Sequence, residues 1–149
     1  MKIGLISSSG GHFAELLSLN SLWSKYNHFW VSFLSCDTRH LLKNKVFYHG
    51  YHPTNRNVLN FFRNLILAYK VILKEKPAVL ISTGAGICVP FFLLGKLFFI
   101  KTIYIESMAR IQSLSLTGKL VYFLADIFIV QWPQLAASYK KAVYKGQVI

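Results

Sequence analysis

The sequence predicts an α/β domain built on one doubly wound, Rossmann-like parallel sheet. Short apolar runs rich in β-branched residues alternate along the chain with longer segments of helical periodicity, a pattern typical of βαβ units. A chain of 149 residues has the size of one domain and can bury a full core. With 54% hydrophobic residues it is too apolar for a disordered chain. We therefore expect residues 1–149 to form a single domain.

The expected elements follow one another in strict alternation. Strands are expected over residues 3–7, 29–35, 46–49, 78–82, 102–106 and 127–131, with a final extended run over 142–145. Helices are expected over residues 13–23, 57–76, 86–99 and 115–124, with a short helix or turn over 37–45 and a short helix after residue 135. Pro77 ends the long helix, and Pro90 lies in a first helical turn, where proline is tolerated. Ligands of such a sheet bind at the carboxyl ends of its strands.

Charge and composition exclude several classes of protein. The chain has 17 Lys and Arg against five Asp and Glu, and its net charge of +12 calls for nucleic acid, anionic lipid or a phosphorylated substrate. No RNP, KH, helix-turn-helix or zinc-finger pattern accompanies the charge, which disfavours nucleic acid. The acids are too scattered for a local metal-binding motif, so we expect no metal and no cofactor. Cys36 and Cys88 are expected to be reduced and to face the core.

The loop over residues 7–12 joins the first strand to the first helix and contains Ser9, Gly10 and Gly11. Adjacent glycines let a ligand approach the backbone closely, and the helix that follows directs unpaired N–H groups toward it. The loop is neither GxGxxG nor a Walker motif, which gives little support to dinucleotide or ATP binding. Two interpretations stay open: a tight turn, or an anion site in which His12 is a general base or a diphosphate ligand.

A second loop, over residues 82–86, repeats this arrangement with Gly84 and Gly86. Each loop alone is weak support for a site, but two at the mouth of one parallel sheet favour a cleft for an anion or a sugar diphosphate.

Two acids also follow expected strands. Glu106 ends an apolar strand, where it either accepts hydrogen bonds from ligand hydroxyls in the crevice or pairs with Arg110. Asp37 follows the second strand and either binds a hydroxyl or caps the next helix, the commoner role for aspartate at that place. Both acids are therefore candidates for the cleft, each with a structural alternative.

The long helix is basic and amphipathic. Arg56, Arg63, Lys70 and Lys74 fall on one side of it, and the side chains gathered on the opposite side are Phe61, Phe62, Leu65, Ile66, Tyr69, Ile72 and Leu73. The apolar side either dips into an anionic membrane or packs on the sheet and leaves a solvated basic stripe.

The segment over residues 89–100 is apolar nearly all round, which indicates a helix buried on every side. Complete burial is hard to arrange in one small domain, so its excess apolar surface is expected to meet a membrane or a partner. Phe91, Phe92, Phe98 and Phe99 are its candidate contacts. The uninterrupted apolar runs are too short for a spanning helix.

Five runs of the sequence resemble one family of glycosyltransferase subunits. They cover residues 3–12, 84–90, 104–110, 114–119 and 126–133, in order along nearly the whole chain. They resemble the membrane-associated subunit of the split UDP-N-acetylglucosamine transferase that extends dolichol-diphosphate-linked N-acetylglucosamine, and equally its bacterial relatives in capsule and exopolysaccharide synthesis. The last run is long enough to be specific.

The resemblance implies one half of a GT-B glycosyltransferase, equivalent to its N-terminal half. That half binds the polyprenyl-diphosphate-linked acceptor and the membrane, while a separate chain holds most of the UDP-sugar. By this resemblance His12 and Glu106 serve catalysis. The expected acceptor and diphosphate ligands are Ser9, Gly10, Gly11, Asp37, Gly84, Gly86 and Arg110. The expected contacts with the partner chain are Trp132, Tyr144, Val148 and Ile149.

The eukaryotic subunit begins with a hydrophobic anchor, whereas here the first strand begins at Lys2. We therefore expect a bacterial-type member held peripherally at the cytoplasmic face of the plasma membrane. Two alternatives stay open beside a shared active site. One is a non-catalytic recruiter of a partner that is active on its own, and the other is a small nucleotide-binding enzyme active by itself.

Overall fold

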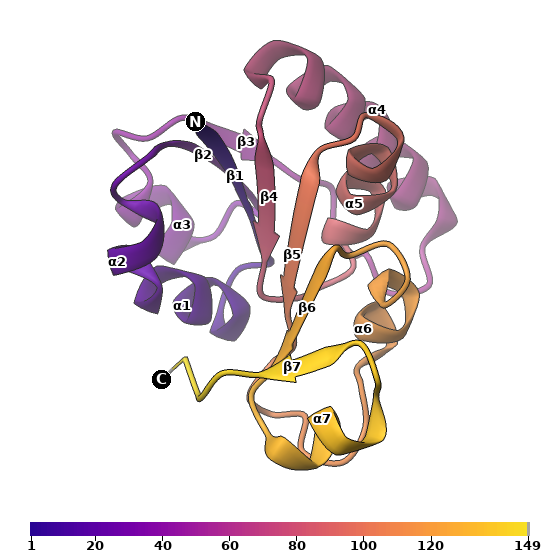
Figure 1. Ribbon diagram of the computed structural model, residues 1–149. Helices are drawn as coiled ribbons and strands as arrows, with labels where there is room; N and C mark the ends of the chain where they lie inside the picture. The colour runs from indigo at the N-terminus through magenta and orange to yellow at the C-terminus, as the bar shows by residue number, and fades with distance from the viewer. Residues whose placement is uncertain (149) are drawn as a thin grey trace.

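The computed structural model describes residues 1–148, which form a seven-stranded, all-parallel sheet of order β3-β2-β1-β4-β5-β6-β7 (Figure 1). The strands are β1 (Lys2–Ile6), β2 (Asn27–Ser32), β3 (Phe47–His49), β4 (Val79–Ser82), β5 (Lys101–Ile105), β6 (Ile127–Val130) and β7 (Ala142–Tyr144). Each expected strand is present within a few residues of its expected bounds. The predicted doubly wound, Rossmann-like sheet is confirmed.

The helices divide between the two faces of the sheet (Figure 1). They are α1 (Gly11–Ser18), α2 (Asn20–Trp23), α3 (Cys36–Leu41), α4 (Val58–Glu75), α5 (Cys88–Leu97), α6 (Leu116–Val121) and α7 (Pro133–Ser138). Residues of α1 and α2 build one core cluster with Trp30, whereas α4 to α7 contribute to a second cluster around Phe91 and Phe128. The chain changes direction between β1 and β4, and that switch point opens a crevice at their carboxyl ends.

Three local predictions on the first face are corrected. The helix expected over residues 13–23 is divided into α1 and α2 at Leu19, after the Ser18 hydroxyl donates to the carbonyl of Glu15 and competes with helical bonding there. Asp37 is not the cap of α3, because Ser35 accepts from the backbone of Thr38 and closes a capping box. Asp37 lies exposed in the first turn instead. Cys36 is exposed as well, while Cys88 is buried as expected.

Helix α4 faces the sheet with a side of mixed polarity, on which Ala68, Val71 and Ile72 pack in the second core cluster. Asn60 and Asn64 are buried because their side chains bind the backbone of Pro53 and of Tyr51. At the other end of the helix, Glu75 is buried against two partners, Lys2 and Tyr48. These polar anchors leave Phe62, Ile66, Tyr69 and Leu73 of the expected apolar side exposed, whereas Ile72 of the same side is buried. The interpretation in which that side packs on the sheet holds for Ile72 but not for most of the side, and Arg56 lies before the helix instead of on it.

Helix α5 is half core and half surface. Phe91 and Phe92 are fully buried in the second core cluster, so two of the four expected membrane contacts are structural residues. Phe98 and Phe99 follow the helix and are exposed. Among residues 1–148, no helix combines the length and the apolar character needed to cross a bilayer.

Candidate functional site

A cavity of about 560 Å³ lies at the carboxyl ends of the central strands. Its walls come from the loops after β1, β2, β4 and β5, from residues 52–55 before α4, and from the start of α6. Ser9, His12, Gly86 and Arg110 line it, so four of the residues expected to bind the acceptor or serve catalysis come together. The residues that line this cavity include no carboxylate, which suits an anionic ligand.

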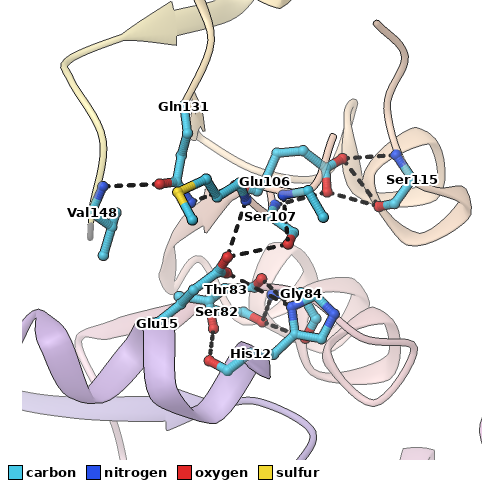
Figure 2. A network of polar contacts seen from close by, with 12 residues as sticks. His12, Glu15, Ser82, Thr83, Gly84, Glu106, Ser107, Ser115, Gln131 and Val148 are labelled. Carbon is cyan, nitrogen blue, oxygen red and sulfur yellow. Dashed lines mark hydrogen bonds and ion pairs between the residues drawn. The ribbon is translucent and has the colours of Figure 1, made fainter. Parts of the chain in front are cut away.

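His12 joins the two glycine-bearing loops. Its Nδ1 lies 2.8 Å from the carbonyl oxygen of Thr83, and the Thr83 hydroxyl donates to the carbonyl of His12 over 2.6 Å (Figure 2). A carbonyl only accepts, so this contact places the ring proton on Nδ1 and leaves the lone pair on Nε2. The ring is fixed in its tautomer and position, and one basic nitrogen remains for a ligand.

Glycine is required under the His12 ring. Gly84 has φ +125°, and a Cβ there would lie 2.6 Å from Cε1 of His12. Gly10 has φ 81° and precedes α1, whose first turn receives no bond from a capping side chain. The first N–H groups of α1 therefore face the loop without a side-chain acceptor, and they carry the positive end of the helix dipole.

Glu15 is a buried acid that the sequence-based reasoning missed. Its Oε1 accepts from the Ser107 hydroxyl at 3.2 Å and from the Met108 backbone at 3.0 Å, while Oε2 lies 3.9 Å from Nδ1 of His12 (Figure 2). One carboxylate thus connects α1 to the loop that carries Arg110. The signal was available, because position 15 follows position 12 by one helical turn and lies on the buried side of α1.

Glu106 is sealed in the interior instead of open to the cleft. Its carboxylate accepts from the backbone of Ser107 and from both the backbone and the hydroxyl of Ser115 (Figure 2). The residue is fully buried, with 0% exposure. The Tyr104 hydroxyl completes the set. Neither the open carboxylate nor the pair with Arg110 is found, because the start of α6 folds over the strand end and satisfies the acid. The geometry assigns Glu106 to holding the cavity wall.

The groups beside Glu106 are equally closed. Burial raises the pKa of the Cys88 thiol to about 12, with the nearby Glu106 charge adding to the effect. Burial also raises the pKa of Tyr104, assisted by Cys88 and Glu106. A thiol with so high a pKa is a poor nucleophile at neutral pH. Of the groups discussed at the carboxyl ends of the strands, His12 is therefore the one that can react with a ligand.

A second cavity of about 750 Å³ shares His12 with the first. It is also lined by Gly11, Glu15, Met108 and Trp132, and the indole N–H of Trp132 donates to the Met108 carbonyl over 2.6 Å. His12 thus stands in a wall common to two cavities.

The remaining expected site residues are dispersed. Asp37 lines neither cavity. Tyr144 lies exposed on the edge strand β7, and the backbone N–H of Val148 donates to Gln131 (Figure 2). Ile149 lies outside the described residues. These positions at the carboxyl end of the chain stay predictions as partner contacts.

Comparison with known proteins decides the family. Residues 51–148 match the family described as "Oligosaccharide biosynthesis protein Alg14 like". The chain belongs to this family. It is 32% identical to human UDP-N-acetylglucosamine transferase subunit ALG14, over 100% of this chain and 83% of that one, and 35% identical to the protein of the same name from Debaryomyces hansenii, over 99% and 76%. The predicted resemblance to this subunit is confirmed, whereas neither relative is named as a capsule or exopolysaccharide protein.

Solved structures with the same fold are larger proteins. Acinetobacter baumannii MurG superposes with a TM-score of 0.76 at 16% identity, over 97% of this chain and 46% of that one. Rickettsia bellii UDP-N-acetylglucosamine 2-epimerase gives 0.75 at 14% identity, over 99% and 45%. The Alg14-like chain spans less than half of each. These similarities establish that it has the fold of one half of such proteins.

Proposed function

We propose that this Alg14-like chain is a non-autonomous subunit of a two-chain, inverting UDP-sugar glycosyltransferase. It binds a polyprenyl-diphosphate-linked sugar and presents the acceptor hydroxyl to a UDP-sugar held mainly by the partner chain. The observation that carries the proposal is His12, fixed by Thr83 with Nε2 free in the wall between two cavities. The names of the relatives, transferase subunits acting with UDP-N-acetylglucosamine, support the donor class.

In the proposed reaction, the acceptor diphosphate occupies the first cavity. Arg110 and the open N–H groups of α1 neutralise its charge. Nε2 of His12 takes the proton of the acceptor hydroxyl while that oxygen attacks the anomeric carbon, and the carbon–oxygen bond to UDP breaks with inversion. The UDP leaves on the partner, which completes the second cavity. The chain's own residues thus supply anion binding and a base without a metal in the scheme.

The decisive experiment is transfer by the reconstituted pair with His12→Ala. General base catalysis contributes about 10²–10⁴ in rate, so kcat should fall by at least about a hundredfold. His40→Ala is the matched control, because His40 is exposed on α3 and lines neither cavity. Turnover of the His12 variant within about threefold of wild type would remove the base from the proposal.

A second proposal is a recruiter that brings an independently active partner to the membrane. The exposed apolar side chains of α4 favour this proposal, because they can bind a membrane but carry no group that could take part in catalysis. Assaying the partner with and without the chain separates the two proposals. Absolute dependence supports the shared site, whereas modest stimulation that persists with His12→Ala supports recruitment.

The cellular setting is the finer part of the proposal. We place the chain peripherally on the cytoplasmic face of a membrane, where lipid-linked acceptors and UDP-sugars meet. A bacterial plasma membrane and a product in capsule or exopolysaccharide stay predictions from the sequence. Transfer assays with undecaprenyl-linked and dolichol-linked acceptors, read by the preferred lipid, test that setting directly.

A further inference from the structure

The outer sides of α4, α5 and α6 form one apolar surface, which we call the three-helix surface. The helices lie side by side on one face of the sheet, α4 against α5 and α5 against α6 (Figure 1). Large exposed apolar side chains project from all three and from the turns that end them. These side chains include Ile66, Leu73, Leu97, Phe99, Leu120 and Phe123.

The exposure is built into the fold. The buried side of α4 is fixed by the amides of Asn60 and Asn64 and by the core packing of Val71, so Ile66 and Leu73 cannot turn inward without breaking those contacts. Phe99 is almost fully exposed at φ 56°, a left-handed conformation that phenylalanine seldom adopts. Soluble monomers seldom expose a contiguous apolar patch of this kind unless something covers it.

The charges around the three-helix surface indicate what kind of partner covers it. Arg63 and Lys74 stack over tyrosines at one flank of α4, and Lys70 lies exposed between them along the helix. On α5 and α6 the exposed charges are again basic: Lys119, and Lys96, which pairs with the partly buried Asp126 after α6. Of the five acids, only Asp37 is exposed, and it lies on α3, on the other face of the sheet (Figure 1). A protein interface commonly matches both signs of charge, whereas anionic headgroups match a single positive sign.

The three-helix surface also reaches the first cavity. Leu116, at the start of α6, is 64% exposed on this surface and lines the cavity as well. Residues 53–55 also line the cavity, and exposed Val58 begins α4 three residues after them. An apolar chain leaving the cavity would therefore meet the three-helix surface at once.

We propose that the three-helix surface docks on an anionic lipid bilayer, with the mouth of the first cavity at the membrane surface. Aromatic and aliphatic side chains enter the interface while Arg63, Lys70 and Lys119 bind headgroups. The polyprenyl tail of the acceptor stays in the lipid as its diphosphate enters the cavity. This last step rests on the proposed function; docking itself does not.

Flotation of the full chain with vesicles tests docking without any assay of transfer. The vesicles are phosphatidylcholine with or without phosphatidylglycerol. The test variant is Ile66→Glu with Leu73→Glu, at 58% and 47% exposure, and its matched control is Leu22→Glu with Leu41→Glu, at 49% and 51% on the other face. Both pairs add the same charge. The first should lower partition onto the anionic vesicles at least about tenfold, and the control should stay within about twofold.

The results of these experiments distinguish a lipid bilayer from a protein partner on the three-helix surface. Equal losses for both pairs, or no loss for either, would overturn the proposal. Unchanged flotation with loss of a co-purifying partner chain would assign the surface to protein and overturn it too. Phe123→Trp, quenched by brominated lipid more strongly than Tyr26→Trp on the other face, supports insertion; equal quenching contradicts it. A chain that floats but supports no transfer overturns the proposed function alone.

Discussion

His12 and Glu106 are polar residues that follow strands β1 and β5, and the sequence makes both candidates for the site. In the structure His12 is open to a ligand, whereas Glu106 is enclosed. His12 follows a glycine pair that leaves space above it, and its Nε2 is available to a ligand. Glu106 is followed by a segment that returns as α6 and covers it, with Ser115 donating twice. A polar residue at a strand end becomes a ligand group only where the next segment stays away from it.

The same comparison explains why the neighbouring glycines are needed. Gly84 lies under the His12 ring, and Gly118 lies against the Glu106 carboxylate, where a Cβ would come within 2.1 Å of Oε2. One glycine leaves room for a ring that meets ligand, and the other lets a helix close on an acid. The close approach of backbone thus positions a ligand-binding ring after β1 and buries a carboxylate after β5.

The largest expected effect comes from Glu106→Ala. The substitution leaves the Ser107 and Ser115 backbone donors buried without an acceptor, which should lower the free energy of unfolding by about 3 kcal/mol or more. His12→Ala should lower it by no more than about 1 kcal/mol. Urea unfolding followed by circular dichroism measures both. Equal destabilisation by the two variants would contradict the assignment of Glu106 to structural support and of His12 to ligand binding.

Substitution of the two glycines sharpens the comparison at smaller cost. Gly118→Ala and Gly84→Ala should each destabilise by about 1–3 kcal/mol, the first by overpacking and the second mainly through its positive φ. Their effects on the reconstituted pair should differ. Transfer per folded molecule should fall more than about tenfold only for Gly84→Ala, because its new methyl displaces the His12 ring. A fully active Gly84→Ala enzyme would show that the ring position is not critical.

Local patterns predicted the strands, the loops and the family, because each depends on residues close in sequence. The orientation of α4 was not predictable in this way. Its apolar side looks like a core side until Asn60 and Asn64 find partners in residues 51–53, contacts that hydrophobicity does not encode. Likewise, the bonds between His12 and Thr83 join positions 71 residues apart, so the loop pattern could suggest the base but not its tautomer.

The smallest expected effect is acid destabilisation from groups at the opposite end of the sheet. Burial opposes ionisation of Glu75 and Asp126, but Lys2 and Tyr48 at Glu75, and Thr102 at Asp126, outweigh it and hold both pKa values below the usual range. Carboxyls with a lowered folded-state pKa add stability above their unfolded values, about 4.3 for Glu and 3.9 for Asp, and lose it as the pH falls through the folded value.

Stability should therefore be level from pH 7 to about 5 and decline below that range, and Asp126→Asn should make the decline shallower. Denaturant midpoints across pH measure it. Because neither Glu75 nor Asp126 lines the cavity at the His12 end, Asp126→Asn should leave transfer by the reconstituted pair unchanged at neutral pH. An unaltered acid limb would show that the Thr102 bonds to Asp126 contribute nothing measurable to stability. A loss of transfer in the same variant would instead mean that the two ends of the sheet are coupled. The comparison between the open His12 and the enclosed Glu106 would then have to include that coupling.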